Sequence, residues 1–196
     1  MAHDPALFAH KQWLGYLQPV GLVVAPHALL AAQAIVPEHV APLQQQLHAL
    51  TRLPADGPRS FGPIRDHRAL FTELLGWRTS DLVDSPESLA HPLPEYGETL
   101  RPTFAVPDPV APQTRPWLLL IQDLPQGTDL DAPAPPSSHG WDAPPQAKFE
   151  RLLRETGVPI GLLHNGALLR LVYAPRGETS GHLTFPLEFM TTVAGR

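Results

Sequence analysis

Two apolar segments of this chain could carry an acidic metal site at their ends. They are ETLRPTFAV (residues 98–106) and LLLIQDL (residues 118–124). Metal-dependent nucleases hold Mg²⁺ with carboxylates at strand ends, and a nearby lysine orients the attacking water. The first segment, however, has a threonine, Thr103, where an aspartate would be expected. We therefore asked whether this is an active nuclease site or only its framework.

The sequence around these segments predicts a sheet that would position them. The run RPWLLLIQDL (115–124) is continuously apolar, which is typical of a central strand covered on both faces. A helix is predicted over QAKFERLLRETG (146–157), ending at Gly157. Two apolar runs then meet at Asn165-Gly166, the dipeptide most typical of a tight β-hairpin.

Most of the helical periodicity lies before the first strand, where Asp66 is the predicted N-cap of a helix in DHRALFTELLGW (66–77). At the other end of the chain, HLTFPLEFM (182–190) is a last strand or a strand-helix junction. We also predict helices over 4–17, 27–36 and 39–50 and a brief strand or extended entry over 20–26. The element order predicts a mixed α/β sheet with a crossover helix. We expect a helical preface over residues 1–58, packed on an α/β core over 59–196 that forms one unit with it.

The composition limits the classes of function. Lys and Arg number 14 against 19 Asp and Glu, which gives a net charge of -5. This argues against a free-standing nucleic-acid binder, because phosphate contacts need a basic surface. The chain has no cysteine, so disulfides, CxxC zinc sites and thiol catalysis are excluded. We expect a cytoplasmic protein with neither a signal peptide nor a membrane span, because prolines and a glycine interrupt the apolar N-terminal region.

Longer stretches resemble a known family. They are WLGYLQPVGLVVAPHAL, LFTELLGW, LRPTFAV, the segment from Trp141 to Phe185, and the closing MTTVAGR. They resemble the N-terminal region of large adenine-specific DNA methyltransferases of the type IIG restriction and phage-defence (DISARM- or BREX-like) kind. The resemblance implies a PD-(D/E)XK restriction-endonuclease-like core with helices on both faces, DNA as a partner, and a methyltransferase domain or subunit in the same system. No SAM-binding glycine loop or Asn-Pro-Pro-Tyr/Phe motif is present, so methylation is not expected of this chain.

The resemblance also implies where a nuclease site would lie. The family pattern has an aspartate on the first strand and a Glu-x-Lys triplet on the second. In this sequence Thr103 takes the aspartate position, Gln122 the glutamate position and Leu124 the lysine position. All three are substituted, so a degenerate, non-catalytic domain with no cofactor is the leading expectation.

A displaced site remains an alternative. Asp108 and Asp123 could hold Mg²⁺ together, with Lys148 replacing the missing lysine and Glu73 supplying a further ligand. The competing interpretation places Asp108 in a solvated loop and Asp123 at a strand end. A third alternative is a detached protein-interaction domain with no role on DNA.

The remaining polar residues give weaker signals. Arg151, Arg154 and Arg170 are candidates for contact with DNA or a partner; alternatively, Arg151 and Arg154 lie on the solvated side of the helix, with Glu150 and Arg154 as an i,i+4 pair. The ten histidines show no HxH, HExxH or HxxxH spacing on a convincing element, which favours scattered surface or core positions.

Overall fold

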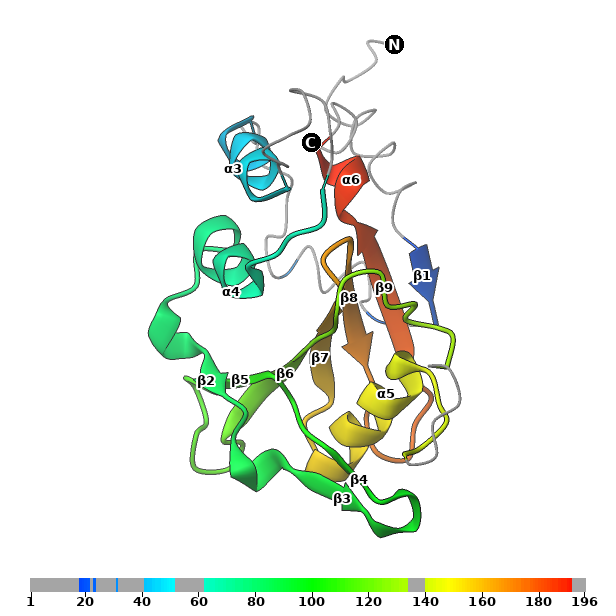
Figure 1. Cartoon of the computed structure of the whole chain (residues 1–196). Coiled ribbons are helices and arrows are strands. Elements are labelled where there is room, and N and C mark those ends of the chain that lie inside the picture. Colours follow the sequence, from blue (N-terminus) through cyan, green and yellow to red (C-terminus); the bar gives the residue numbers. More distant parts are fainter. Residues whose placement is uncertain are drawn as a thin grey trace, which may run out of the picture.

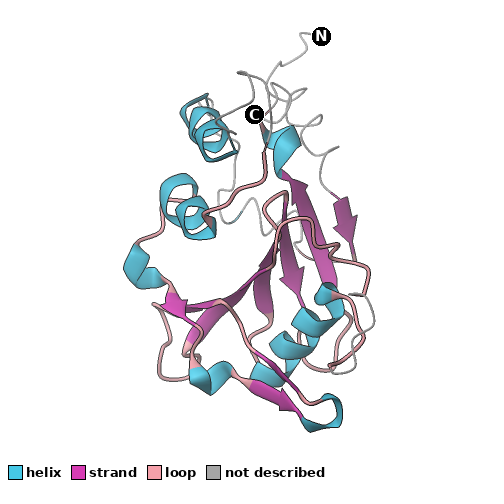
Figure 2. Cartoon of the chain, in the orientation of Figure 1, coloured by secondary structure: helices cyan, strands magenta, loops and turns pink. Residues whose placement is uncertain are grey.

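The computed structural model describes residues 18–21, 23, 31, 41–51, 62–133 and 140–191. Seven of its strands form one sheet in the order β1-β9-β8-β7-β6-β5-β2, and β3 and β4 form a separate pair (Figure 1). The strands are β1 (Gln18–Val20), β2 (Val83–Asp84), β3 (His91–Leu93), β4 (Glu98–Leu100), β5 (Phe104–Pro107), β6 (Trp117–Asp123), β7 (Ile160–His164), β8 (Leu168–Tyr173) and β9 (Gly181–Pro186). The helices are α3 (Ala41–Thr51), α4 (His67–Ala69), α5 (Pro145–Thr156) and α6 (Leu187–Met190). Figure 2 shows how these helices border the sheet.

The sheet is mixed. Strands β6 and β7 run parallel, and every other paired strand of the described sheet is antiparallel. A parallel neighbour needs a crossover connection, and α5 provides it between β6 and β7. The predicted mixed α/β class and the crossover helix are therefore confirmed.

The central strand and the hairpin also agree with the sequence. Strand β6 lies inside the sheet between β7 and β5, and its Leu120 and Ile121 are both fully buried. Asn165 accepts hydrogen bonds from the backbone N–H groups of Ala167 and Leu168, while Gly166 has a φ of 88°. A side chain that closes its own turn, followed by a residue with positive φ, reverses the chain between β7 and β8.

The two faces of the sheet have separate cores. Helix α5 covers one face, where Phe149, Leu152 and Leu153 pack with Leu120 and Leu163. The opposite face packs on α3, α4 and the helical turn that follows α4, through Leu47, Leu70, Phe71, Ile121 and Leu162. In Figure 1, α5 lies at the lower right of the sheet, and α3 and α4 lie at the upper left.

Helix α4 is short and continues into a π-helical turn over Leu70–Leu74. Asp66 caps it as predicted, because its side chain accepts a hydrogen bond of 3.0 Å from the backbone of Ala69. In place of the predicted regular helix, the segment forms one short α-helical turn and then one π-helical turn. It still presents Leu70 and Phe71 to the core.

One strand prediction was wrong. The segment 98–106 does not form a single strand: β4 ends at Leu100 and pairs with β3, whereas β5 begins at Phe104 and joins the large sheet. Pro102 lies between them and lacks the N–H that a continuous ladder requires. The sheet site therefore involves only the second half of the segment.

Part of the predicted preface is described. Strand β1 pairs with β9 at the edge of the sheet, and α3 falls within the helix predicted over 39–50, extended to Thr51. The segment predicted as a strand or extended entry over 20–26 overlaps β1 only at Val20, and the described residues 21 and 23 are bends. The helix predicted over 4–17 and, apart from residue 31, the helix predicted over 27–36 lie outside the described residues, so the division at residue 58 stays a prediction.

Candidate functional site

The three positions expected for nuclease residues do lie together. Thr103 directly precedes β5, and its backbone N–H donates to the carbonyl of Ile121 on β6 at 2.8 Å. Its hydroxyl accepts hydrogen bonds from the backbone N–H of Asp123 at 2.9 Å and, at a long 3.4 Å, from Nε2 of Gln122. Leu124 packs against the core on the α5 side.

This strand pair is neutral. A threonine hydroxyl and an amide supply no negative charge, and Mg²⁺ sites in proteins use one or more carboxylates. A leucine also cannot orient water or stabilise a phosphate. The Thr103 hydroxyl and the Gln122 amide instead hydrogen-bond to each other and to the backbone of Asp123.

Asp108 lies at the opposite end of β6 from Asp123. Its backbone N–H bonds to the carbonyl of Pro116, just before β6 begins, whereas Asp123 ends that strand. At about 3.3 Å per residue, the two carboxylates are about 20 Å apart. They cannot share a cation.

The Asp108 carboxylate has local partners. Oδ1 accepts backbone hydrogen bonds from Val110 at 2.8 Å and Ala111 at 3.2 Å, and Oδ2 pairs with Arg115. The bond from Val110, followed by the Arg115 guanidinium, holds the pKa of Asp108 below its ordinary value. A turn-closing carboxylate of this kind accounts for the residue without catalysis.

Lys148 also lies away from Asp123. Lys148 projects from α5, on the other face of the sheet, and its Nζ contacts both carboxylate oxygens of Glu98 at 2.8 and 2.9 Å. Glu73 is exposed on the turn after α4. Asp108 and Lys148 therefore do not join Asp123 in a displaced site, because Asp108 lies at the far end of β6 and Lys148 lies on the other face of the sheet.

The candidate contact arginines are all engaged within the chain. Arg151 pairs with Glu95 at 2.9 Å and lies 5.2 Å from the centroid of the Trp141 ring. Arg154 pairs with Glu150 at 3.4 Å, the i,i+4 alternative that the sequence left open.

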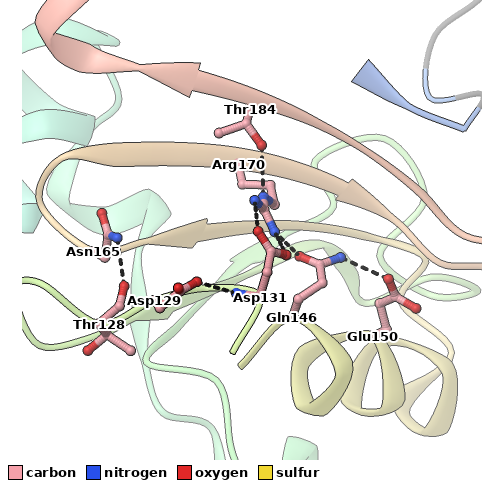
Figure 3. A network of polar contacts seen from close by, with 8 residues as sticks. All are labelled: Thr128, Asp129, Asp131, Gln146, Glu150, Asn165, Arg170 and Thr184. Carbon is pink, nitrogen blue, oxygen red and sulfur yellow. Dashed lines mark hydrogen bonds and ion pairs between the residues drawn. The ribbon is translucent and has the colours of Figure 1, made fainter. Parts of the chain in front are cut away.

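Arg170 is buried and cannot reach DNA. Its side chain is only 4% exposed, and it forms a bidentate ion pair with Asp131 at 2.6 and 2.8 Å (Figure 3). It also donates to Gln146 at 3.2 Å and to Thr184 at 2.8 Å. These bonds connect β8 to β9, to the N-terminus of α5 and to the loop after β6, so its role is structural.

A different group of side chains gathers on the α4 face. Asp123 and His164 end the two parallel strands β6 and β7 and are paired in register. They share a face with Ile121 and Leu162, because side chains alternate along a strand. His67, the first residue of α4, places Nδ1 at 3.2 Å from Oδ2 of Asp123. The rings of His67 and His164 meet edge to face, with centroids 4.4 Å apart.

The two histidines have opposite electrostatics. The hydrogen bond that His67 donates to the Asp123 carboxylate is the largest influence on His67 and raises its pKa above the ordinary value of 6.5. Burial lowers the pKa of His164 to about 3, so its imidazole is neutral at pH 7. His164 is completely buried, and among the described residues no group hydrogen-bonds either of its ring nitrogens or Oδ1 of Asp123.

Solvent reaches the cluster from one side. A shallow depression of about 430 Å³ adjoins it, lined by Arg65, Asp66, His67, Arg68, Phe104 and Asp123. His67 and Asp123 are 15% and 13% exposed in their side chains, while His164 lies beneath them. One ligand atom from each of the three residues falls within 4.8 Å of the others, which is a grouping able to hold a metal ion.

Local sequence spacing did not predict this cluster, because His67, Asp123 and His164 come from three distant segments and form no short metal-binding motif. A signal was present: LLLIQD and IGLLH are apolar runs that each end in a metal-binding residue type. The ends of parallel neighbouring strands meet at one edge of a sheet, so a prediction of parallel pairing would have placed the two together.

Comparison of this chain with models of protein families, with curated proteins and with solved structures found no match. Within the described residues, no helix combines the length and apolarity needed to cross a membrane.

Proposed function

We propose that this chain is a non-catalytic, restriction-endonuclease-like domain of a DNA restriction or phage-defence methyltransferase system, acting as a cytoplasmic scaffold or docking module. The observation that carries the proposal is the neutral pair Thr103 and Gln122, joined on neighbouring strands where a nuclease needs carboxylates. The mixed sheet with helices on both faces supports the fold assignment that the sequence resemblance implies.

The charge arrangement favours docking to protein over positioning DNA. Apart from Arg65 and Arg176, every lysine and arginine in the described ranges pairs with a carboxylate. Arg176 donates instead to the backbone carbonyls of Arg154 and Glu155. Basic side chains already neutralised within the fold offer little counterion release on binding phosphates.

A plasmid-nicking assay tests the loss of catalysis. We expect supercoiled DNA to remain intact in Mg²⁺ or Mn²⁺, with the same result for the Asp108→Ala variant. Metal-dependent nicking by the wild-type chain that disappears in Thr103→Val or Asp123→Asn would contradict the proposal.

Two binding measurements test the docking role. Fluorescence anisotropy with a labelled duplex at low salt is expected to detect only weak, salt-sensitive binding. Titration calorimetry with the methyltransferase of the same system is expected to give a saturable 1:1 complex. Tight DNA binding without binding to the methyltransferase would favour a DNA-positioning role instead.

A further inference from the structure

We propose that His67, Asp123 and His164 bind one divalent transition-metal ion of the zinc class, with a coordination position open to the adjoining depression. This site lies on the α4 face of the sheet, whereas Thr103, Gln122 and Leu124 belong to the α5 face. The inference is therefore independent of the nuclease-like assignment.

The donor set selects the class of ion. Two imidazoles and one carboxylate match zinc and its first-row neighbours, whereas Mg²⁺ and Ca²⁺ prefer sites made of oxygen atoms. Three protein ligands are also the number found in zinc sites that keep a position for water or another ligand.

The geometry is close to that of a bound site. Two ligand atoms of a tetrahedral zinc ion are about 3.4 Å apart, given metal–ligand bonds of about 2.1 Å. Nδ1 of His67 and Oδ2 of Asp123 are already 3.2 Å apart, and the three ligand atoms lie within 4.8 Å of one another. A movement of the order of 1 Å by the His164 ring would complete the set.

The buried polar atoms give the second, independent observation. His164 is fully buried, yet neither ring nitrogen has a hydrogen-bond partner among the described residues. The buried Oδ1 atom of Asp123 also has no partner among them. Buried polar groups are nearly always satisfied, and exceptions point to an unseen ion or water. His164 faces the two potential ligands, so a metal ion at that point would satisfy one ring nitrogen.

The framework holds the ligands on regular elements. Asp123 and His164 end adjacent strands in a fixed register, and Asp66 caps the helix that begins with His67. The open position would face the depression that Arg65, Asp66 and Arg68 line, where water or hydroxide could reach it. Metal binding would fasten α4 to the ends of β6 and β7.

The test uses the full chain, stripped of metal with a chelator. Isothermal titration with Zn²⁺ is expected to give one site per chain and a melting temperature that rises with zinc concentration. Co²⁺ is expected to bind at the same site with visible absorption bands typical of low-symmetry nitrogen and oxygen ligation. Zinc should also shift the ring-nitrogen NMR signals of His67 and His164.

Matched variants assign the ligands. His67→Gln and Asp123→Asn are expected to weaken zinc binding at least tenfold, whereas His91→Gln, a half-buried histidine on β3, should bind as the wild type does. His67 is at the edge of the site, so its variant is expected to fold, which circular dichroism checks. Absence of binding by the folded wild-type chain, or binding that His67→Gln and Asp123→Asn leave unchanged, would overturn the proposal.

Discussion

At the scale of single residues, the same side-chain type has opposite roles in different surroundings. The Asp108 carboxylate accepts backbone hydrogen bonds and pairs with Arg115. One carboxylate oxygen of Asp123, beside two histidines, has no hydrogen-bond partner among the described residues. Arg170 is likewise removed from any surface role by its bonds to Asp131, Gln146 and Thr184 (Figure 3). Burial and partners, which the residue type does not encode, decide what each group can do.

The Arg170 network gives a stability prediction. Asp131→Asn should lower the free energy of unfolding by about 2–3 kcal/mol, because it leaves a buried guanidinium without its charged partner. We expect less than a fully buried pair would lose, since the Asp131 side chain is 61% exposed and screened by water. Urea denaturation at pH 7 measures the change. Asp129→Asn, in the same loop, is the matched control and should change stability by less than about 0.5 kcal/mol.

The pH dependence of stability tests whether the charge of Asp131 is responsible. The hydrogen bond from Arg170 is the largest influence on Asp131 and lowers its pKa below the ordinary value of 3.8. A lowered folded-state pKa means that the stabilisation is present in full above pH 3.8 and is lost as pH falls through the folded-state pKa. The difference between the wild type and Asp131→Asn should be constant between pH 7 and 5 and shrink below pH 3.8. A difference that stays the same in acid would show that packing, and not the carboxylate charge, is responsible.

At the scale of elements, α5 is packed unusually closely on β7. A Cβ atom added at Gly161 would lie 2.5 Å from Cζ of Phe149 and 3.0 Å from Cδ2 of Leu153. Both neighbours are buried, so neither has free space into which it could move. The absence of a side chain at Gly161 therefore sets the distance between the crossover helix and the sheet.

The close approach predicts the effect of a single methyl group. Gly161→Ala should lower the free energy of unfolding by roughly 1–3 kcal/mol through overpacking. Combining it with Phe149→Leu should lose less stability than the sum of the two single changes, because the shorter side chain relieves the clash. Urea denaturation of the four proteins of this cycle measures the coupling. Additive losses would mean that the helix moves away from the strand instead.

At the scale of the whole molecule, the sheet separates two regions. The neutral pair of Thr103 and Gln122 belongs with the α5 core, and the histidine cluster belongs with the α4 core. The two regions share strand β6, whose side chains alternate between the faces, so that Gln122 belongs to the pair and Asp123 to the cluster. The backbone N–H of Asp123 bonds to the Thr103 hydroxyl, so the packing of α5 at Phe149, and not the Thr103 pair, is where stability can be perturbed without moving the ligands.

Two equivalent phenylalanines test this separation. Phe71 and Phe149 are both buried, at 0% and 2% exposure, on the α4 and α5 faces respectively. Replacing either with leucine should cost roughly 1–2 kcal/mol of stability, less than complete truncation would. Only Phe71→Leu should weaken zinc binding, because Phe71 holds the turn that continues from His67. Equal weakening in both variants, measured by calorimetry, would contradict the independence of the faces.

The sequence by itself determined the local elements. Gly157 ends α5 with a φ of 75°, Asn165-Gly166 closes the hairpin, and the apolar run of β6 lies inside the sheet. These features depend on backbone preferences and on alternation over a few residues, which neighbouring residues encode directly.

Only the tertiary structure decided which polar groups meet. The parallel register of β6 and β7 brings Asp123 beside His164, and the packing of α4 adds His67. The tertiary structure also buries Arg170, places Lys148 on the other face of the sheet and leaves Asp108 at the far end of β6. Pro102 divides the segment 98–106 between two sheets. Such outcomes depend on contacts between residues far apart in the chain, and the spacing of residue types along it does not specify them.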